Sequence, residues 1–119
     1  MRHTIEHYED GLSLITIEGD MLGLHQFQPL LDEVDHLILE DHNLFVIDLQ
    51  NTRFLNSSGL SVLTMILAKA RKAGGEVVLS EIPDTINKLL VITKLNSIFT
   101  IMANREEAIV ELRSLLILE

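Results

Sequence analysis

The sequence contains no cysteine, and aromatic residues make up only 4% of its 119 residues. The lack of cysteine excludes a disulfide scaffold, a thiolate metal site and a cysteine nucleophile. Because hydrophobic residues reach 47% with so few aromatic rings, we expect a core of leucine, isoleucine and valine. The length suits one domain, which we expect to span residues 1–119.

Long hydrophobic segments are also missing from the chain. No apolar run approaches the roughly 18 residues that a membrane-spanning helix needs. Residues 1–6 lack the apolar segment of a signal peptide. We therefore expect a cytoplasmic protein that is not inserted into a membrane.

Positive charge is scarce in the first half of the chain. The net charge is −9, and Arg2 is the only Lys or Arg before residue 51, whereas 11 of the 18 Asp and Glu lie there. Such a surface is repelled by nucleic-acid phosphates and by anionic lipid headgroups, so we expect no nucleic-acid partner. It can attract a basic protein partner, and it also serves solubility.

Hydrophobic periodicity predicts an α/β fold. Strands are expected at residues 4–8, 12–18, 44–49, 76–80 and 98–102, and helices at 24–38, 58–73, 83–93 and 104–116. The turn Glu9-Asp10-Gly11 makes the first two strands a hairpin, and Asn104 with Glu107 forms a capping-box pattern. The order ββαβαβαβα predicts a mixed, mostly parallel sheet flanked by helices.

The segment Asn56-Ser57-Ser58-Gly59-Leu60 connects a buried strand to a helix. Residues 51–58 and Gly19-Asp20-Met21-Leu22 are expected together at the carboxyl ends of the strands, where such sheets bind ligands. One explanation of the segment is structural: Ser57 or Ser58 caps the helix, and Gly59 allows close packing. The other is functional, because the positive end of a helix tolerates a phosphate. A phosphoserine adds roughly −1.5 to −2 charges and would expel a partner that packs there.

The element order and the segment from Asp48 to Leu60 resemble the STAS domain, the fold of bacterial anti-sigma factor antagonists. In that family an apolar strand ends in Asp, and Asp-Ser-Ser/Thr-Gly-Leu then opens a helix. Asp48 matches the strand Asp, the residues from Ser57 to Leu60 match the turn, and residues 73–79 resemble the Gly-Gly turn into the next strand.

The resemblance implies that Ser57 is a phosphoacceptor. A serine-kinase anti-sigma factor would bind and phosphorylate the chain, and a PP2C-type phosphatase would reverse the mark. The chain itself would then be neither an enzyme nor a cofactor carrier. The residues expected to shape this site or contact the partner are Asp20, Asn56, Ser58, Gly59, Ser61 and Met65.

Two positions depart from the family pattern. Asn56 stands where many switchable members have Asp, and Leu22 stands where the Gly-Glu-Leu-Asp pattern has its last acidic residue. Asparagine keeps an acceptor and gains donors, but it loses the charge. Both departures favour an alternative: a STAS subunit that is not phosphorylated and serves as a scaffold in a larger lipid-transport or signalling assembly.

Other kinds of site find little support. The five histidines, His3, His7, His25, His36 and His42, show no metal-ligand spacing, so we expect no metal. A nucleophile elbow, a P-loop and a dinucleotide fingerprint are missing. A phosphoaspartate receiver built on Asp48 would have only Asp20 and Lys94 as partners. An enzyme reading therefore rests on fold analogy alone.

Overall fold

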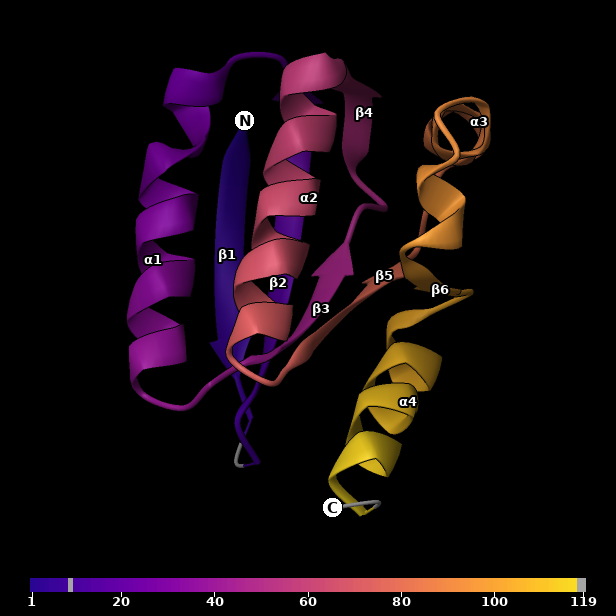
Figure 1. Cartoon of the computed structure of the whole chain (residues 1–119). Coiled ribbons are helices and arrows are strands. Elements are labelled where there is room, and N and C mark those ends of the chain that lie inside the picture. The colour runs from indigo at the N-terminus through magenta and orange to yellow at the C-terminus, as the bar shows by residue number, and fades with distance from the viewer. Residues whose placement is uncertain (9, 118–119) are drawn as a thin grey trace.

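The computed structural model describes residues 1–8 and 10–117, and it contains a six-stranded mixed sheet (Figure 1). The strands are β1 (Arg2–His7), β2 (Leu12–Met21), β3 (Leu44–Asp48), β4 (Thr52–Leu55), β5 (Glu76–Ser80) and β6 (Thr100–Met102). Their order is β1-β2-β3-β5-β6, and β4 pairs with β2 off this path. Only β1 runs antiparallel to its neighbour, so the sheet is mixed and mostly parallel, as predicted.

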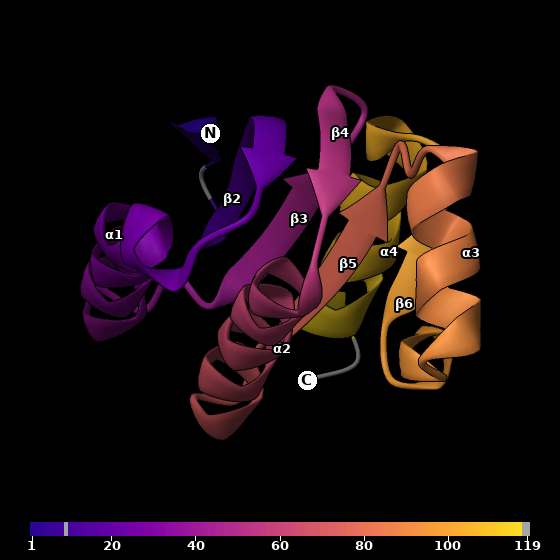
Figure 2. The ribbon, with the colours of Figure 1, turned by 90° about the horizontal axis from the view of Figure 1, so that it is seen from above.

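Helices cover both faces of the sheet. They are α1 (Gln28–Leu39), α2 (Ser57–Lys72), α3 (Asp84–Ile92) and α4 (Arg105–Ile117), with short 3-10 turns η1 (Leu24–Phe27) and η2 (Leu95–Ser97). Seen from above, α1 and α2 lie on one face, α4 lies on the other, and α3 stands beside β6 (Figure 2). This arrangement leaves the carboxyl ends of the parallel strands at one edge of the molecule.

The alternation of side chains along the strands divides the core in two. On β3, Phe45 and Ile47 pack toward α1 and α2, whereas Leu44 and Val46 pack toward Ala108 and Leu112 of α4. This is the two-sided burial expected for a central parallel strand. The prediction of an aliphatic core holds for most of these residues. Three phenylalanines are also buried: Phe27, Phe45 and Phe99.

The structure adds one strand to the predicted order, which becomes ββαββαβαβα. The connection after Asp48 contains β4, which pairs in parallel with residues Gly19, Asp20 and Met21 of β2. The prediction missed it because β4 has only four residues and no hydrophobic alternation. It forms because β2 continues to Met21, beyond the predicted end at residue 18 and beyond its pairing with β3, which ends at Thr16 and Asp48.

The first predicted helix is split in two. Residues 24–27 form η1, and α1 begins at Gln28 with Pro29 in its first turn, where proline loses no intrahelical hydrogen bond. The end of α2 fits its prediction: Gly74 has a φ of 85°, and the amide of Gly75 donates to the Ala70 carbonyl. Glu9 of the predicted hairpin turn and the side chain of Leu24 lie outside the described part of the chain.

A partly buried ion pair joins α4 to the end of β3, in addition to the apolar contacts described above. The carboxylate of Asp48 is 1% exposed and binds the guanidinium of Arg105, which is 38% exposed. The other oxygen of Asp48 accepts a hydrogen bond from the Gln50 amide at 2.9 Å. The hydrogen bond to Asp48 raises the pKa of Arg105 above its ordinary value, so the guanidinium stays charged. A carboxylate buried in this way does not offer the accessible acceptor of a receiver domain.

Replacing Arg105 and replacing Asp48 should lower the free energy of unfolding by different amounts. Arg105→Met leaves a buried carboxylate without its cation and should lower the free energy of unfolding by about 3 kcal/mol. Asp48→Asn leaves a guanidinium that reaches water and should cost about 1 kcal/mol. Urea denaturation followed by circular dichroism measures both. Arg113→Met, which breaks an exposed pair with Asp10, is the control. An Asp48→Asn cost equal to or above that of Arg105→Met would contradict this account.

Candidate functional site

The predicted site lies where α2 begins. Asn56 is the N-cap residue, with extended backbone, and its Oδ1 accepts hydrogen bonds from the amides of Ser58 at 3.0 Å and Gly59 at 3.2 Å. The expectation that Ser57 or Ser58 caps the helix is therefore wrong. Asparagine takes this position because its side-chain carbonyl reaches the second and third helical amides as well as a serine hydroxyl does.

The capping by Asn56 leaves Ser57 free for another role. Ser57 is the first residue of α2 and is exposed, while Ser58 is half-buried. Among the hydrogen bonds of the described residues, none involves the hydroxyl of Ser57. Its position on the first helical turn also places it at the positive end of the helix dipole.

The amide nitrogen of the Asn56 side chain joins the turn to the end of β2. Its Nδ2 donates to the carbonyl of Leu22 at 2.9 Å, and its backbone amide donates to the carbonyl of Met21 at 3.3 Å. The predicted meeting of residues 19–22 with residues 51–58 is thus confirmed. The bond to Leu22 uses its main-chain carbonyl, which any residue at position 22 would supply, whereas an aspartate at position 56 would have no donor for it.

Gly59 is required by close packing. A Cβ at this position would lie 2.9 Å from the carbonyl oxygen of Met21 and 2.6 Å from Cδ1 of Leu55. The contact with the Met21 backbone cannot be relieved by a side-chain rotation. Glycine therefore lets the first turn of α2 rest on the ends of β2 and β4, as the sequence predicts.

Asp20 lies beside β4 and contacts its residues. It lies opposite Phe54 in the β2–β4 pairing, and its carboxylate pairs with Arg53, with Nε 3.3 Å from Oδ1. No hydrogen bond or ion pair of the described residues connects Asp20 to Ser57 or Asn56. Arg53 was not predicted as a site residue. The available signal was its position, because it is the only Lys or Arg among residues 3–68.

The outer face of α2 carries the two other predicted residues. Ser61 and Met65 are exposed, while Leu63, Ile66, Leu67 and Ala70 form the buried stripe. Residues 54–68 contain no charged side chain. Two apolar residues near the turn were missed: Phe54, which is 63% exposed, and Leu22, which is also exposed.

Four of the five histidines make contacts that are separate from one another or join only two rings. His3 approaches Glu33 at 3.3 Å and His36 approaches Glu40 at 2.7 Å, while the rings of His7 and His42 meet edge to face. In the described residues, no three His, Asp or Glu side chains are placed to hold a metal ion. Across the same residues, no helix is both long and apolar enough to cross a membrane.

The capping role of Asn56 predicts unequal effects of two substitutions. Asn56→Ala removes the acceptor for two helix amides and should lower the free energy of unfolding by about 1–2 kcal/mol. Asn56→Asp keeps the acceptor and adds a favourable charge at the helix N-terminus, so it should cost less than half as much despite losing the bond to Leu22. Urea melts of both variants measure the difference. A neutral Asn56→Ala would show that the cap is not used in solution.

The fold is shared with solved structures of anti-sigma factor antagonists. SpoIIAA in its unphosphorylated form matches with a TM-score of 0.76 and 18% identity, over 94% of this chain and 98% of that chain. The Bacillus SpoIIAA in its phosphorylated form matches with a TM-score of 0.74 and 18% identity, over 92% and 98%. A putative anti-sigma factor antagonist from Thermotoga maritima matches with a TM-score of 0.79 and 21% identity, over 93% and 94%.

The sequence itself carries the family signature. The profile of the STAS domain matches residues 5–108, a span that runs from β1 into α4 and includes the turn around Ser57. At identities near 20%, the solved structures establish the fold, whereas the profile establishes membership. The chain therefore belongs to the STAS domain family.

Proposed function

We propose that this chain is a cytoplasmic regulator of the anti-sigma factor antagonist type, which binds a serine-kinase anti-sigma factor and is released when Ser57 is phosphorylated. The chain acts as a phosphate acceptor and not as an enzyme, and a PP2C-type phosphatase restores the binding form. The observation that carries the proposal is the exposed Ser57 on the first turn of α2, with the capping bonds made by Asn56 instead.

Accessibility favours Ser57 over Ser58 as the acceptor. A kinase must bring the γ-phosphate of ATP to the acceptor hydroxyl. Ser57 is exposed, whereas Ser58 is half-buried. A phosphate on Ser57 would also sit at the positive end of α2, where the dipole favours negative charge. The fold therefore tolerates both forms of the residue.

The surroundings of Ser57 suit a switch that acts on a docked partner. Residues 54–68 carry no charge, and Leu22, Phe54 and Met65 expose apolar side chains around the turn. A partner that covers this surface gains from apolar burial. A dianionic phosphate at Ser57 would have to be desolvated under the same partner, which disfavours binding. The acidic remainder of the chain favours encounter with a basic partner.

One observation supports the scaffold alternative. Asn56 and Leu22 occupy positions where the family pattern places acidic residues, so these two positions supply no carboxylate beside Ser57. A STAS subunit of a lipid-transport or signalling assembly needs the docking surface but not the phosphate. Purification of the tagged chain distinguishes the two functions. Co-elution with a small kinase would support the phosphoswitch, and co-elution with transporter ATPase subunits would support the scaffold.

Intact-mass measurement tests the phosphoswitch directly. After incubation with ATP and extract of the source organism, the wild-type chain should gain one phosphate and Ser57→Ala should gain none. Ser58→Ala should still gain one, because it keeps the exposed hydroxyl. An unmodified wild-type chain, or an undiminished increment in Ser57→Ala, would remove the phosphoswitch and leave the scaffold.

The docking surface gives a separate test. Phe54→Ser and Met65→Ser should each weaken binding of the anti-sigma factor by about tenfold, since each loses roughly 1.4 kcal/mol of apolar burial. Val110→Ser, which removes an exposed apolar side chain from α4, is the matched control and should have no effect. Isothermal titration calorimetry measures the affinities. Equal losses in all three variants would place the interface elsewhere.

A further inference from the structure

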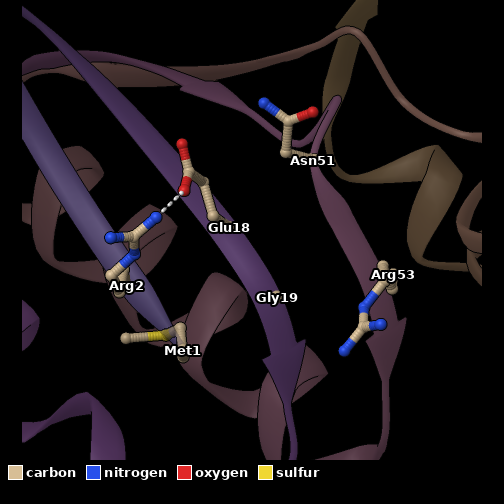
Figure 3. A pocket seen from close by; sticks show the side chains of 6 residues that line it. All are labelled: Met1, Arg2, Glu18, Gly19, Asn51 and Arg53. Atoms are coloured by element: carbon tan, nitrogen blue, oxygen red, sulfur yellow. Dashed lines mark hydrogen bonds and ion pairs between the residues drawn. The ribbon is translucent and has the colours of Figure 1, made fainter.

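A hollow of about 480 Å³ lies at the carboxyl end of β2, next to β4 (Figure 3). We call it the arginine hollow. Its lining comes from the start of β1, from β2, and from the segment leading into β4: Met1, Arg2, Glu18, Gly19, Asn51 and Arg53. Open α/β sheets bind their ligands at this edge of the strands.

The arginine hollow collects the cations of the first part of the chain. Arg2 and Arg53 are the only Lys or Arg residues among residues 1–68. They lie 51 positions apart in the sequence, yet the fold brings both to the same hollow. In Figure 3 the two side chains lie on opposite sides of the β2 segment that contains Glu18 and Gly19. Because the first half of the chain is strongly acidic, the arginine hollow is the place in this half where an anion can contact arginine side chains.

Neighbouring carboxylates orient the two guanidiniums without enclosing them. Arg2 pairs with Glu18 at 3.0 Å and Arg53 pairs with Asp20 at 3.3 Å, but the arginine side chains remain 86% and 72% exposed. Each guanidinium has five N–H donors, of which these pairs use only a part. Exposed ion pairs are weak and exchange partners readily. The remaining donors are therefore available to a ligand.

The floor of the hollow is kept open by glycine. Gly19 has a φ of 95°, and the β2–β4 register shifts between Gly19 and Asp20. The amide of Gly19 donates to the carbonyl of Asn51 at 2.9 Å, which holds the segment before β4 against β2. A side chain at position 19 would project toward Met1, so its absence preserves space between the arginines.

We propose that the arginine hollow binds a small dianion of the phosphate-ester type, bridged between Arg2 and Arg53. Such a group presents several oxygens at one end, and guanidiniums bind these oxygens in a forked, bidentate geometry. Glu18 and Asp20 oppose the ligand charge, which lowers the affinity. The net charge of −9 repels long polyanions, so the site selects small ligands over nucleic acid.

Inorganic pyrophosphate is the probe for this site. It is titrated into the full chain at low salt, with any purification tag at the carboxyl end, and amide chemical shifts are followed by NMR. Saturable shifts should appear at Gly19, Asn51 and Arg53. Arg2→Gln and Arg53→Gln should each weaken binding at least tenfold. Both side chains are exposed, so the variants should fold normally.

Two controls separate the site from general charge effects and from the proposed switch. Arg113→Gln changes the net charge equally but lies in an ion pair with Asp10 outside the hollow, and it should bind as wild type does. Ser57→Ala should also retain binding, which distinguishes this site from the phosphoswitch. The absence of saturable shifts, or an equal loss in Arg113→Gln and Arg53→Gln, would overturn the proposal. So would acetate binding as tightly as pyrophosphate.

Discussion

The amide of Asn56 connects segments that are 34 residues apart, and the turn that carries Ser57 depends on it. Its oxygen caps α2, and its nitrogen binds the carbonyl of Leu22 at the end of β2. Because one side chain satisfies the helix amides, the hydroxyl of Ser57 is not needed for structure. The same residue that departs from the family pattern thus sets the shape of the turn while leaving its serine exposed.

The length of β2 provides the platform for this turn. β2 continues past its last pair with β3, and this free length is what β4 pairs with. Gly59 then lets α2 start directly above the two strand ends. On the opposite face, Arg105 neutralises the buried Asp48 and fixes α4 to the same edge of the sheet. Without Arg105, the carboxylate of Asp48 would be buried without a cation.

Periodicity and turn chemistry are local signals, and they predicted most of the fold. The apolar run at residues 44–49 and the glycines at 74–75 identified a central strand and a helix end from neighbouring residues alone. β4 was not predicted because its pairing depends on how far β2 extends. The cap on α2 was misassigned because Asn56, Ser57 and Ser58 are all good capping residues. The ion pair of Arg53 with Asp20 joins residues 33 positions apart, which no local pattern reveals.

β4 connects the two candidate sites, since Arg53 lies within it and Asn56 follows its last residue. It has four residues and one strand partner, β2, so it is held by far fewer contacts than β2 or β3. Segments of this kind open more often than the core of a domain. A fluctuation that detaches β4 from β2 would disturb the arginine hollow and the Ser57 turn together. Amide hydrogens at both places should then exchange with solvent as one cooperative unit, at a rate set by β4.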